Sequence, residues 1–257
     1  MKAFKVFSIS IVLVILYVIS SAAQTKSPTF VIPKYSLSVS VGYDYAFAKA
    51  NGDPKGFSTI YNEELKQALF TAKNYGMQQG GNILVTGKMA IDKRKKFRLT
   101  GALGYTLFYN TEDAGMNRTK WSIFTLGAGM EYDLKRDSKT RSYVSFELDY
   151  NLLFGAWQTD VTFPDNTMSN IYIKFKPGSR LGIAIGTGAE FKVNKRTSVI
   201  AGIKGVWANI APKQNSYTVS GYDAYLNDSG NSSGINLGSS KQIIYMQIFS
   251  GISFALF

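Results

Sequence analysis

The stretch VSFELDYNLLF, residues 144–154, alternates between large apolar side chains and small, polar or acidic ones. Successive residues of a β-strand point to opposite faces of the sheet. One face would carry Val144, Phe146, Leu148, Tyr150, Leu152 and Phe154, and the other Ser145, Glu147, Asp149 and Asn151. The stretch therefore predicts a strand with one apolar face and one acidic, hydrogen-bonding face.

The same alternation recurs along the chain and predicts eight strands, at 35–46, 82–92, 97–109, 121–134, 142–157, 180–193, 198–209 and 242–257. Their less apolar face is rich in Gly, Ala and Ser, which suits the crowded interior of a narrow barrel. The other face carries large apolar residues, with aromatic residues towards the strand ends, as in the girdles of membrane barrels. A soluble sandwich or lipocalin-type barrel also alternates, but its water-facing set would be rich in Lys, Glu and Thr.

The connections between these strands alternate in length. Those at 93–96, 135–141 and 194–197 are short, whereas those at 47–81, 110–120, 158–179 and 210–241 are longer. Even-stranded outer-membrane barrels have short periplasmic turns and longer outer loops. We therefore expect an all-β, eight-stranded, antiparallel up-and-down transmembrane β-barrel in a bacterial outer membrane, with both termini in the periplasm.

Within the first long loop, the segment NEELKQALFTAKNYG, residues 62–76, has an apolar stripe at helical spacing. Leu65, Ala68, Leu69 and Ala72 form that stripe, while Asn62 can cap the start and Gly76 the end. The segment predicts a short helix in the first outer loop.

The first residues predict a secretory signal peptide. Lys2 and Lys5 precede an apolar run from Ile9 to Ile19, and small residues follow up to Ala23. A membrane anchor helix is the alternative, but it would need about 20 apolar residues. We expect residues 1–23 to be removed and residues 24–257 to form the outer-membrane β-barrel domain.

Composition limits the chemistry. The chain contains no His and no Cys, so His-based triads, thiol nucleophiles and His or Cys metal sites are excluded. We therefore expect no enzymatic activity and no cofactor.

The net charge of +12 is concentrated in the three short connections, which hold ten basic residues and one acid, whereas the four long ones hold ten basic residues and nine acids. Basic clusters beside a bilayer attract anionic lipid headgroups or acidic partners, or else are solvated turn residues. An exported barrel has no obvious nucleic acid to meet, so we expect none as a partner.

Charged residues also fall on the inward face of the predicted barrel. They are Asp44, Lys88, Arg98, Glu131, Asp133, Glu147, Asp149, Glu190, Lys192 and Lys204. In an interior that side chains fill, opposite charges should pair, which favours a salt-bridged plug over an ion-conducting path. The pairs Glu131 with Asp133 and Glu147 with Asp149 could in principle do acid–base work, but they are better explained as members of that plug.

This pattern resembles the small eight-stranded outer-membrane barrels, the group that contains OmpX, OmpW and the OmpA membrane domain. The segment AGIKGVWANI, residues 201–210, is also similar to PorT-type barrels. The enzymatic members of this class generally use a catalytic His, which this chain lacks. The resemblance further implies an assembly signal in the last strand, read by the barrel assembly machinery: Phe257, with Phe254 and Gly251. Ala255 departs from that pattern, because a second aromatic residue would be expected there.

The function that these observations favour is a non-enzymatic outer-membrane barrel whose loops bind a partner, or whose body supports an envelope assembly. Its expected partners are outer-membrane lipid, the assembly machinery during insertion and other envelope proteins. The alternatives are a narrow pore or transport path for small apolar solutes, and a soluble periplasmic barrel that binds a hydrophobic ligand.

Overall fold

The computed structural model describes residues 32–48, 50–51, 57–62, 67–72, 75–111, 118–136, 139–162, 168–213, 223–224, 226, 228, 231–232, 235–236 and 241–256. The segment expected to be a signal peptide and the terminal Phe257 lie outside these residues.

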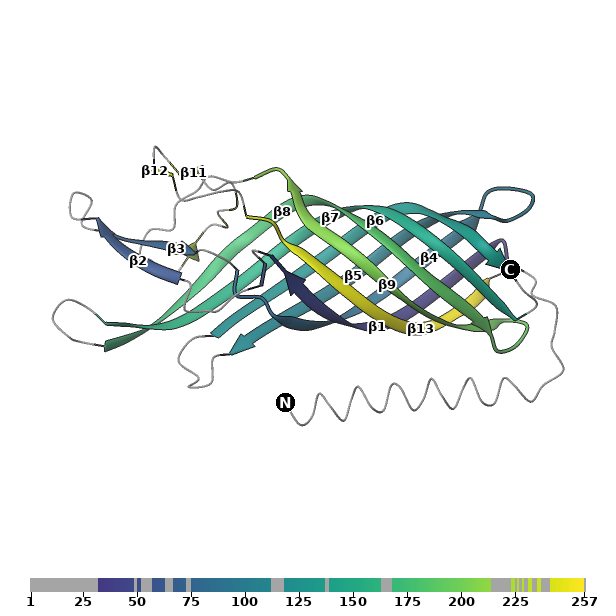
Figure 1. Ribbon diagram of the computed structural model, residues 1–257, viewed down its shortest axis with the longest axis horizontal. Helices are drawn as coiled ribbons and strands as arrows, with labels where there is room; N and C mark the ends of the chain where they lie inside the picture. Colours follow the sequence, from purple (N-terminus) through teal and green to yellow (C-terminus); the bar gives the residue numbers. More distant parts are fainter. Residues whose placement is uncertain are drawn as a thin grey trace.

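The chain folds into a closed antiparallel β-barrel (Figure 1). Its strands run in the order β8-β7-β6-β5-β4-β1-β13-β9, and pairing of β9 with β8 closes the barrel. The two-residue strand β10 joins the edge of β8 outside the barrel, so eight strands form the wall. The bounds are β1 Tyr35–Phe47, β4 Gln79–Ala90, β5 Phe97–Thr111, β6 Arg118–Arg136, β7 Thr140–Thr162, β8 Met168–Lys192, β9 Thr197–Ala211 and β13 Ile244–Leu256. The predicted fold class is confirmed, and each predicted strand overlaps one strand of the wall.

The predicted helix in the first loop is wrong for the part of it that the structure describes. Strand β2 (Phe57–Asn62) pairs with β3 (Gln67–Ala72) in an antiparallel hairpin. The partner sequence FSTIYN is rich in aromatic and β-branched residues, which favour strands. Pairing with it overrides the helical spacing within residues 62–76. The other short strands are β10 (Asp223–Ala224), β11 (Asn231–Ser232) and β12 (Ile235–Asn236).

The two faces of the wall differ as the alternation predicted. Large apolar side chains from every strand of the wall are exposed on the outside, with Leu148 at 59% and Ile185 at 62% exposure. Their neighbours in sequence, such as Glu147 and Ala184, are buried inside. A closed barrel leaves no unpaired strand edge, and an apolar outer band suits contact with lipid rather than water. Among the described residues, no helix has the length and apolar character needed to cross a membrane.

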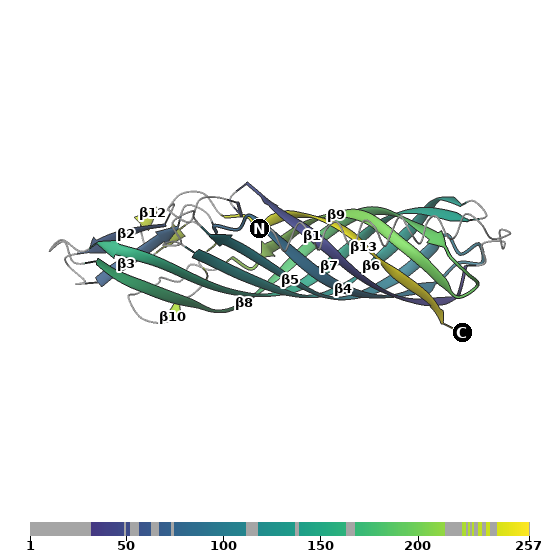
Figure 2. The ribbon, with the colours of Figure 1, turned by 90° about the horizontal axis from the view of Figure 1, so that it is seen from below.

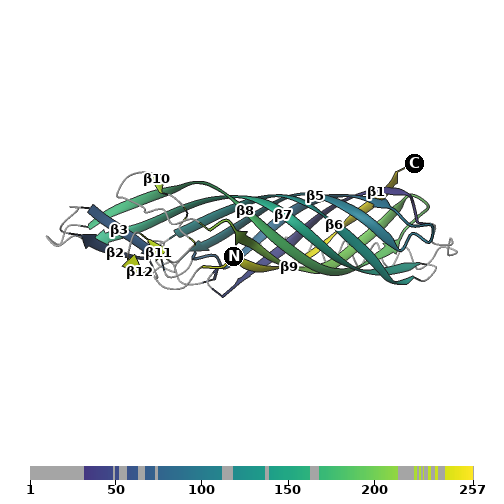
Figure 3. The ribbon, with the colours of Figure 1, turned by 90° about the horizontal axis from the view of Figure 1, so that it is seen from above.

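Strands β7 and β8 are longer than their neighbours, with 23 and 25 residues against 19 in β6 and 15 in β9. About 9–11 residues of a tilted strand suffice to span a bilayer. The two long strands therefore continue as a ribbon past the ends of β1, β4 and β5 (Figures 2 and 3). The ribbon remains paired up to Thr162 and Met168.

Candidate functional site

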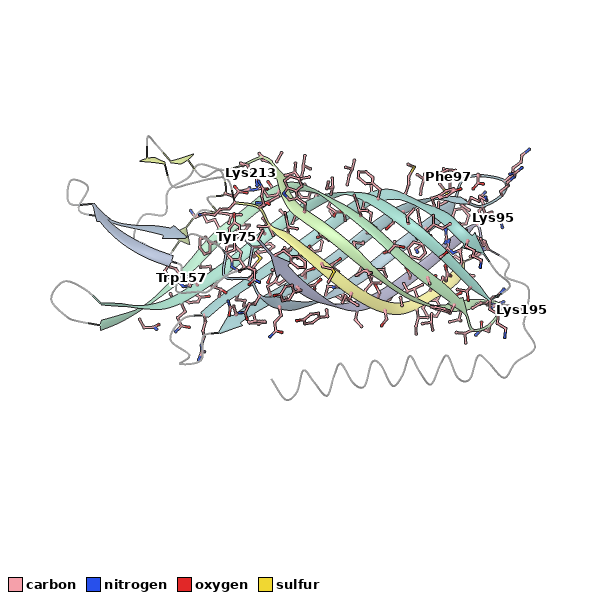
Figure 4. The ribbon with its side chains drawn as sticks, viewed as in Figure 1. Tyr75, Lys95, Phe97, Trp157, Lys195 and Lys213 are labelled. Atoms are coloured by element: carbon pink, nitrogen blue, oxygen red, sulfur yellow. The ribbon has the colours of Figure 1, made fainter. Side chains whose placement is uncertain are left out.

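The barrel has two different ends. The turns at 91–96 and 193–196 lie at one end, called here the turn end, where β6 ends at Arg136 opposite Arg141 and where β13 also finishes. The other end, called the loop end, carries the long connections. In Figure 4, Lys95, Phe97 and Lys195 lie at the turn end, whereas Tyr75, Trp157 and Lys213 lie towards the loop end.

A charge network fills the interior at the turn end. Its members come from five strands: Lys88, Arg98, Glu131, Asp133, Arg141 and Glu190. Arg141 lies at its centre, with Nη1 at 2.6 Å from Asp133 and Nη2 at 2.6 Å from Glu190 and 2.9 Å from Glu131. Lys88 and Arg98 also approach Glu131, at 2.7 and 2.6 Å. Three cations thus meet three carboxylates, and a balanced, bonded set of this kind is the form in which charges tolerate burial.

The middle of the barrel is less evenly balanced. Lys204 donates to both carboxylate oxygens of Glu147, at 3.0 and 2.8 Å. Asp44 accepts two hydrogen bonds from the Asn82 amide, at 2.9 and 3.0 Å. Asp149 is buried, and its Oδ1 atom has no hydrogen-bond partner. The middle section thus carries more acid than base.

Near the loop end the interior becomes apolar. A buried cluster there includes Met77, Phe108, Trp121, Leu153 and Tyr245. The Trp121 ring stacks on Phe175 at 5.0 Å and meets Tyr75 edge-on at 5.3 Å. These large side chains close the barrel above the charged part.

The chain after β3 returns into the mouth of the barrel and is held there by polar contacts. Trp121 Nε1 donates to the Tyr75 carbonyl at 2.7 Å, and Thr119 Oγ1 donates to the Gly76 carbonyl at 2.6 Å. Gly76 has a φ of 62°, a conformation that a residue without Cβ adopts most easily. Burial raises the pKa of the Tyr75 hydroxyl well above its usual value. The first loop therefore contributes directly to the plug.

The fourth loop (212–243) is anchored in the same mouth. Asp228 is fully buried and accepts hydrogen bonds from Arg180 Nε at 2.8 Å and Nη2 at 2.9 Å. Asn209 donates to the same carboxylate at 2.9 Å. Lys213 lies 3.9 Å from it, and burial lowers the pKa of Lys213 while Asp228 opposes this shift. Leu226, from the same loop, joins the apolar cluster.

Two cavities among the described residues of the interior are small. They measure about 20 Å³ each and lie along the barrel, one beside Asp149 and Gln247 and the other beside Lys88 and Tyr143. Each has room for roughly one water molecule. Within the described residues, no three His, Cys, Asp or Glu side chains are grouped so as to hold a metal ion. These interior features point to a plugged barrel.

Of the ten charged residues expected inside, the structure buries all except Lys192, which is partly exposed at the end of β8. Both carboxylate pairs are engaged with cations through Glu131, Asp133 and Glu147. In the last strand, Phe254 is exposed on the lipid face and Gly251 lies against β1, opposite Ser40.

Two buried arginines were not among the expected interior charges. Arg141 was counted among the turn residues, which is wrong: it belongs to β7, is fully buried and is the centre of the network. Arg180 begins the inward-facing run Arg180, Gly182, Ala184. The sequence did contain a signal for Arg141. It is separated by an even number of residues from Tyr143 and Glu147, so it lies on the same face of the strand as they do. The three short connections therefore carry one positive charge fewer than was counted from the sequence.

Comparisons with known proteins concern the fold. No protein-family model and no curated protein matches the chain. Among solved structures, it is similar to Neisserial surface protein A, with 13% identity and a TM-score of 0.45 over 87% of this chain and 97% of that one. It is also similar to Ail, the attachment invasion locus protein of Yersinia pestis, with 10% identity and a TM-score of 0.38 over 87% and 100%. A third is the outer membrane protease OmpT from Escherichia coli, with 8% identity and a TM-score of 0.41 over 90% and 100%.

At these identities the likenesses say nothing about activity, and the assignment of the fold rests on strand order, closure and the two faces of the wall. On those grounds the chain is a small eight-stranded β-barrel of the outer-membrane type, with transmembrane strands and a filled interior.

Proposed function

We propose that this protein is a non-enzymatic outer-membrane barrel that presents a binding surface outside the bilayer on the β7–β8 ribbon. The observation that carries the proposal is the combination of a filled interior with a projecting ribbon. From Gly155 to Thr162, β7 continues in register with β8, and from Thr159 onwards it has no further pairing with β6 among the described residues. At about 3.3 Å per residue, Thr159–Thr162 extend roughly 13 Å beyond the last pair with β6.

The ribbon offers polar and aromatic groups together. Gln158 Nε2 donates to Asn170 Oδ1 at 2.9 Å across the two strands, and Tyr172 is 54% exposed. Beyond Leu181, the edge of β8 is paired within the described residues only by β10, at Lys174 and Phe175. Exposed strand edges and aromatic side chains are common elements of binding surfaces.

The interior argues against the pore hypothesis. The apolar cluster around Trp121 and the charge network around Arg141 occupy successive parts of the barrel, and the cavities hold about one water each. The outer face argues against the soluble alternative, because it would expose apolar side chains of all eight strands to water.

The contacts of the carboxylates support the absence of enzymatic activity. Glu131, Asp133 and Glu147 are buried and bound to cations, so a substrate has no access to them. The lack of His and Cys removes the usual nucleophile-activating groups.

Two experiments test the proposal. In planar bilayers the purified mature protein should show no conductance steps, and reproducible steps would establish a pore instead. A photo-crosslinking amino acid at Tyr172 should form protein adducts on intact cells, whereas the same amino acid at the lipid-facing Leu126 should not. Adducts at both positions, or at neither, would contradict presentation by the ribbon.

A further inference from the structure

The surface of the turn end carries a dense set of exposed cations, called here the basic rim: Lys34, Lys93, Arg94, Lys96, Lys135, Lys139, Lys195 and Arg196. Among the described residues of this surface, Asp92 is the one acid. Like charges at this density repel one another across a Debye length of about 8–10 Å. The rim is therefore a surface that favours a bound anion.

Hydrogen bonds hold these cations in one continuous surface. Lys95 Nζ donates to the Ile32 carbonyl at 2.6 Å, which ties the turn at 91–96 to the chain before β1. Backbone bonds join the neighbouring segments: Ala90 N to Lys34 O, Asp133 N to Lys96 O, Lys192 N to Lys139 O and Ala255 N to Arg196 O. The rim thus passes from one turn to the next around the barrel.

The acids nearby offset only a small part of this charge. Desolvation raises the pKa of Asp92, but backbone hydrogen bonds from Phe97 and Lys96 have the larger effect and lower that pKa. The carboxylate therefore accepts hydrogen bonds from the backbone of its own turn. Inside the barrel, Glu131, Asp133 and Glu190 are balanced by the cations of the buried network. The rim therefore has an excess of positive charge.

Next to the rim, aromatic side chains mark the level of the membrane interface. Tyr35, Phe97 and Tyr132 are exposed on the outer wall at the turn end of their strands. Phe97 and Tyr132 pack at 4.8 Å, and Lys34 Nζ lies 5.4 Å from the Tyr35 ring centroid. Aromatic girdles lie at headgroup depth in membrane barrels, which places the cations just beyond them level with lipid phosphates.

We propose that the basic rim is a binding surface for anionic glycerophospholipids. The lysine and arginine side chains would bind the headgroup phosphates, while the acyl chains would lie against the aromatic and aliphatic wall above the turns. This proposal is independent of the ribbon, because it concerns the opposite end of the barrel.

The test is native mass spectrometry of the full mature protein, released from micelles that contain equal amounts of two lipids. With phosphatidylglycerol and zwitterionic phosphatidylcholine, we expect at least tenfold more phosphatidylglycerol bound, with the ratio falling as salt is raised. Equal binding of the two lipids would overturn the proposal. A second experiment offers lipopolysaccharide and phosphatidylglycerol together. Preferential binding of lipopolysaccharide would show that the rim binds the phosphates of a different lipid, and this would also overturn the proposal.

Matched variants locate the site. K93Q/R94Q/K96Q removes three charges from the rim and should lower phosphatidylglycerol binding several-fold. K120Q/K174Q/K176Q removes three exposed charges towards the loop end and should leave it unchanged. An equal loss in both variants would show a response to net charge alone and contradict a site at the rim. Heat-dependent gel migration checks that both variants are folded.

Discussion

Arg180 holds Asp228 by two hydrogen bonds, 2.8 Å from Nε to Oδ2 and 2.9 Å from Nη2 to Oδ1, in the mouth of the barrel. One residue belongs to the wall and the other to the fourth loop, and both are buried. The paired geometry of a guanidinium and a carboxylate gives direction as well as strength to this contact. It anchors a loop segment above the interior that the strands enclose.

Breaking this contact should release the loop. D228A leaves the buried Arg180 without its carboxylate, which typically costs about 3–5 kcal/mol of stability. We expect trypsin to cleave the folded variant faster at Lys213 and Lys241. Gel electrophoresis of timed samples measures the rate of cleavage. The double variant R180L/D228L removes both charges and should be less destabilised than D228A alone. Unchanged cleavage in D228A would show that other contacts hold the loop.

Arg141 should be the most sensitive member of the charge network. R141M removes the cation closest to Asp133 and Glu190 and leaves them Arg98 at 3.8 and 3.6 Å, so the free energy of unfolding should fall by about 3–5 kcal/mol. Urea unfolding in lipid vesicles measures this change. The matched control is K139M, which removes an exposed cation two residues away and should shift stability by less than about 0.5 kcal/mol.

Asp149 and Glu147 lie on the same face of β7 and should respond in opposite ways to loss of charge. Asp149 Oδ1 lacks a hydrogen-bond partner, so D149N removes a poorly compensated charge and should stabilise the barrel by about 1–3 kcal/mol. E147Q instead deprives Lys204 of its carboxylate and should destabilise it by about 3 kcal/mol. The same urea titration compares the two. Destabilisation by D149N would mean that its carboxylate is satisfied in the native barrel.

Local alternation in the sequence was sufficient for the wall. It predicted the strands and which side chains face inwards, because strand parity is a property of neighbouring residues. It was less informative about what fills the barrel. The inward face was expected to be small and polar, yet Phe108, Trp121 and Tyr245 occupy it near the loop end. Parity assigns a side chain to a face but does not determine the depth at which the interior widens enough for an aromatic ring.

The contacts of the loops could not be predicted from local alternation either, for a different reason. Asp228 meets Arg180 only because the fold brings residues far apart in the chain to one mouth, and neither residue shows this in its local sequence. The hairpin of β2 and β3 likewise depends on a pairing partner, whereas the helical spacing of Leu65, Ala68 and Leu69 is judged within one segment. Contacts of this kind need the three-dimensional arrangement.

The first and last strands of the barrel, β1 and β13, pack closely against each other. Gly251 of β13 pairs with Ser40 of β1, and a Cβ atom at Gly251 would collide with the Val39 carbonyl oxygen and would lie 2.5 Å from the Ser40 Cα atom. G251A should therefore separate the first and last strands locally and lower the free energy of unfolding by about 1–3 kcal/mol.

Gly101 is the matched control, because a Cβ there meets nothing within 4 Å. G101A should be neutral within about 0.5 kcal/mol. Unfolding is measured on protein that is already assembled, so an effect on stability is separated from the predicted role of Gly251 in the assembly signal. Equal stability of the two variants would show that the closing strands tolerate a side chain at this position.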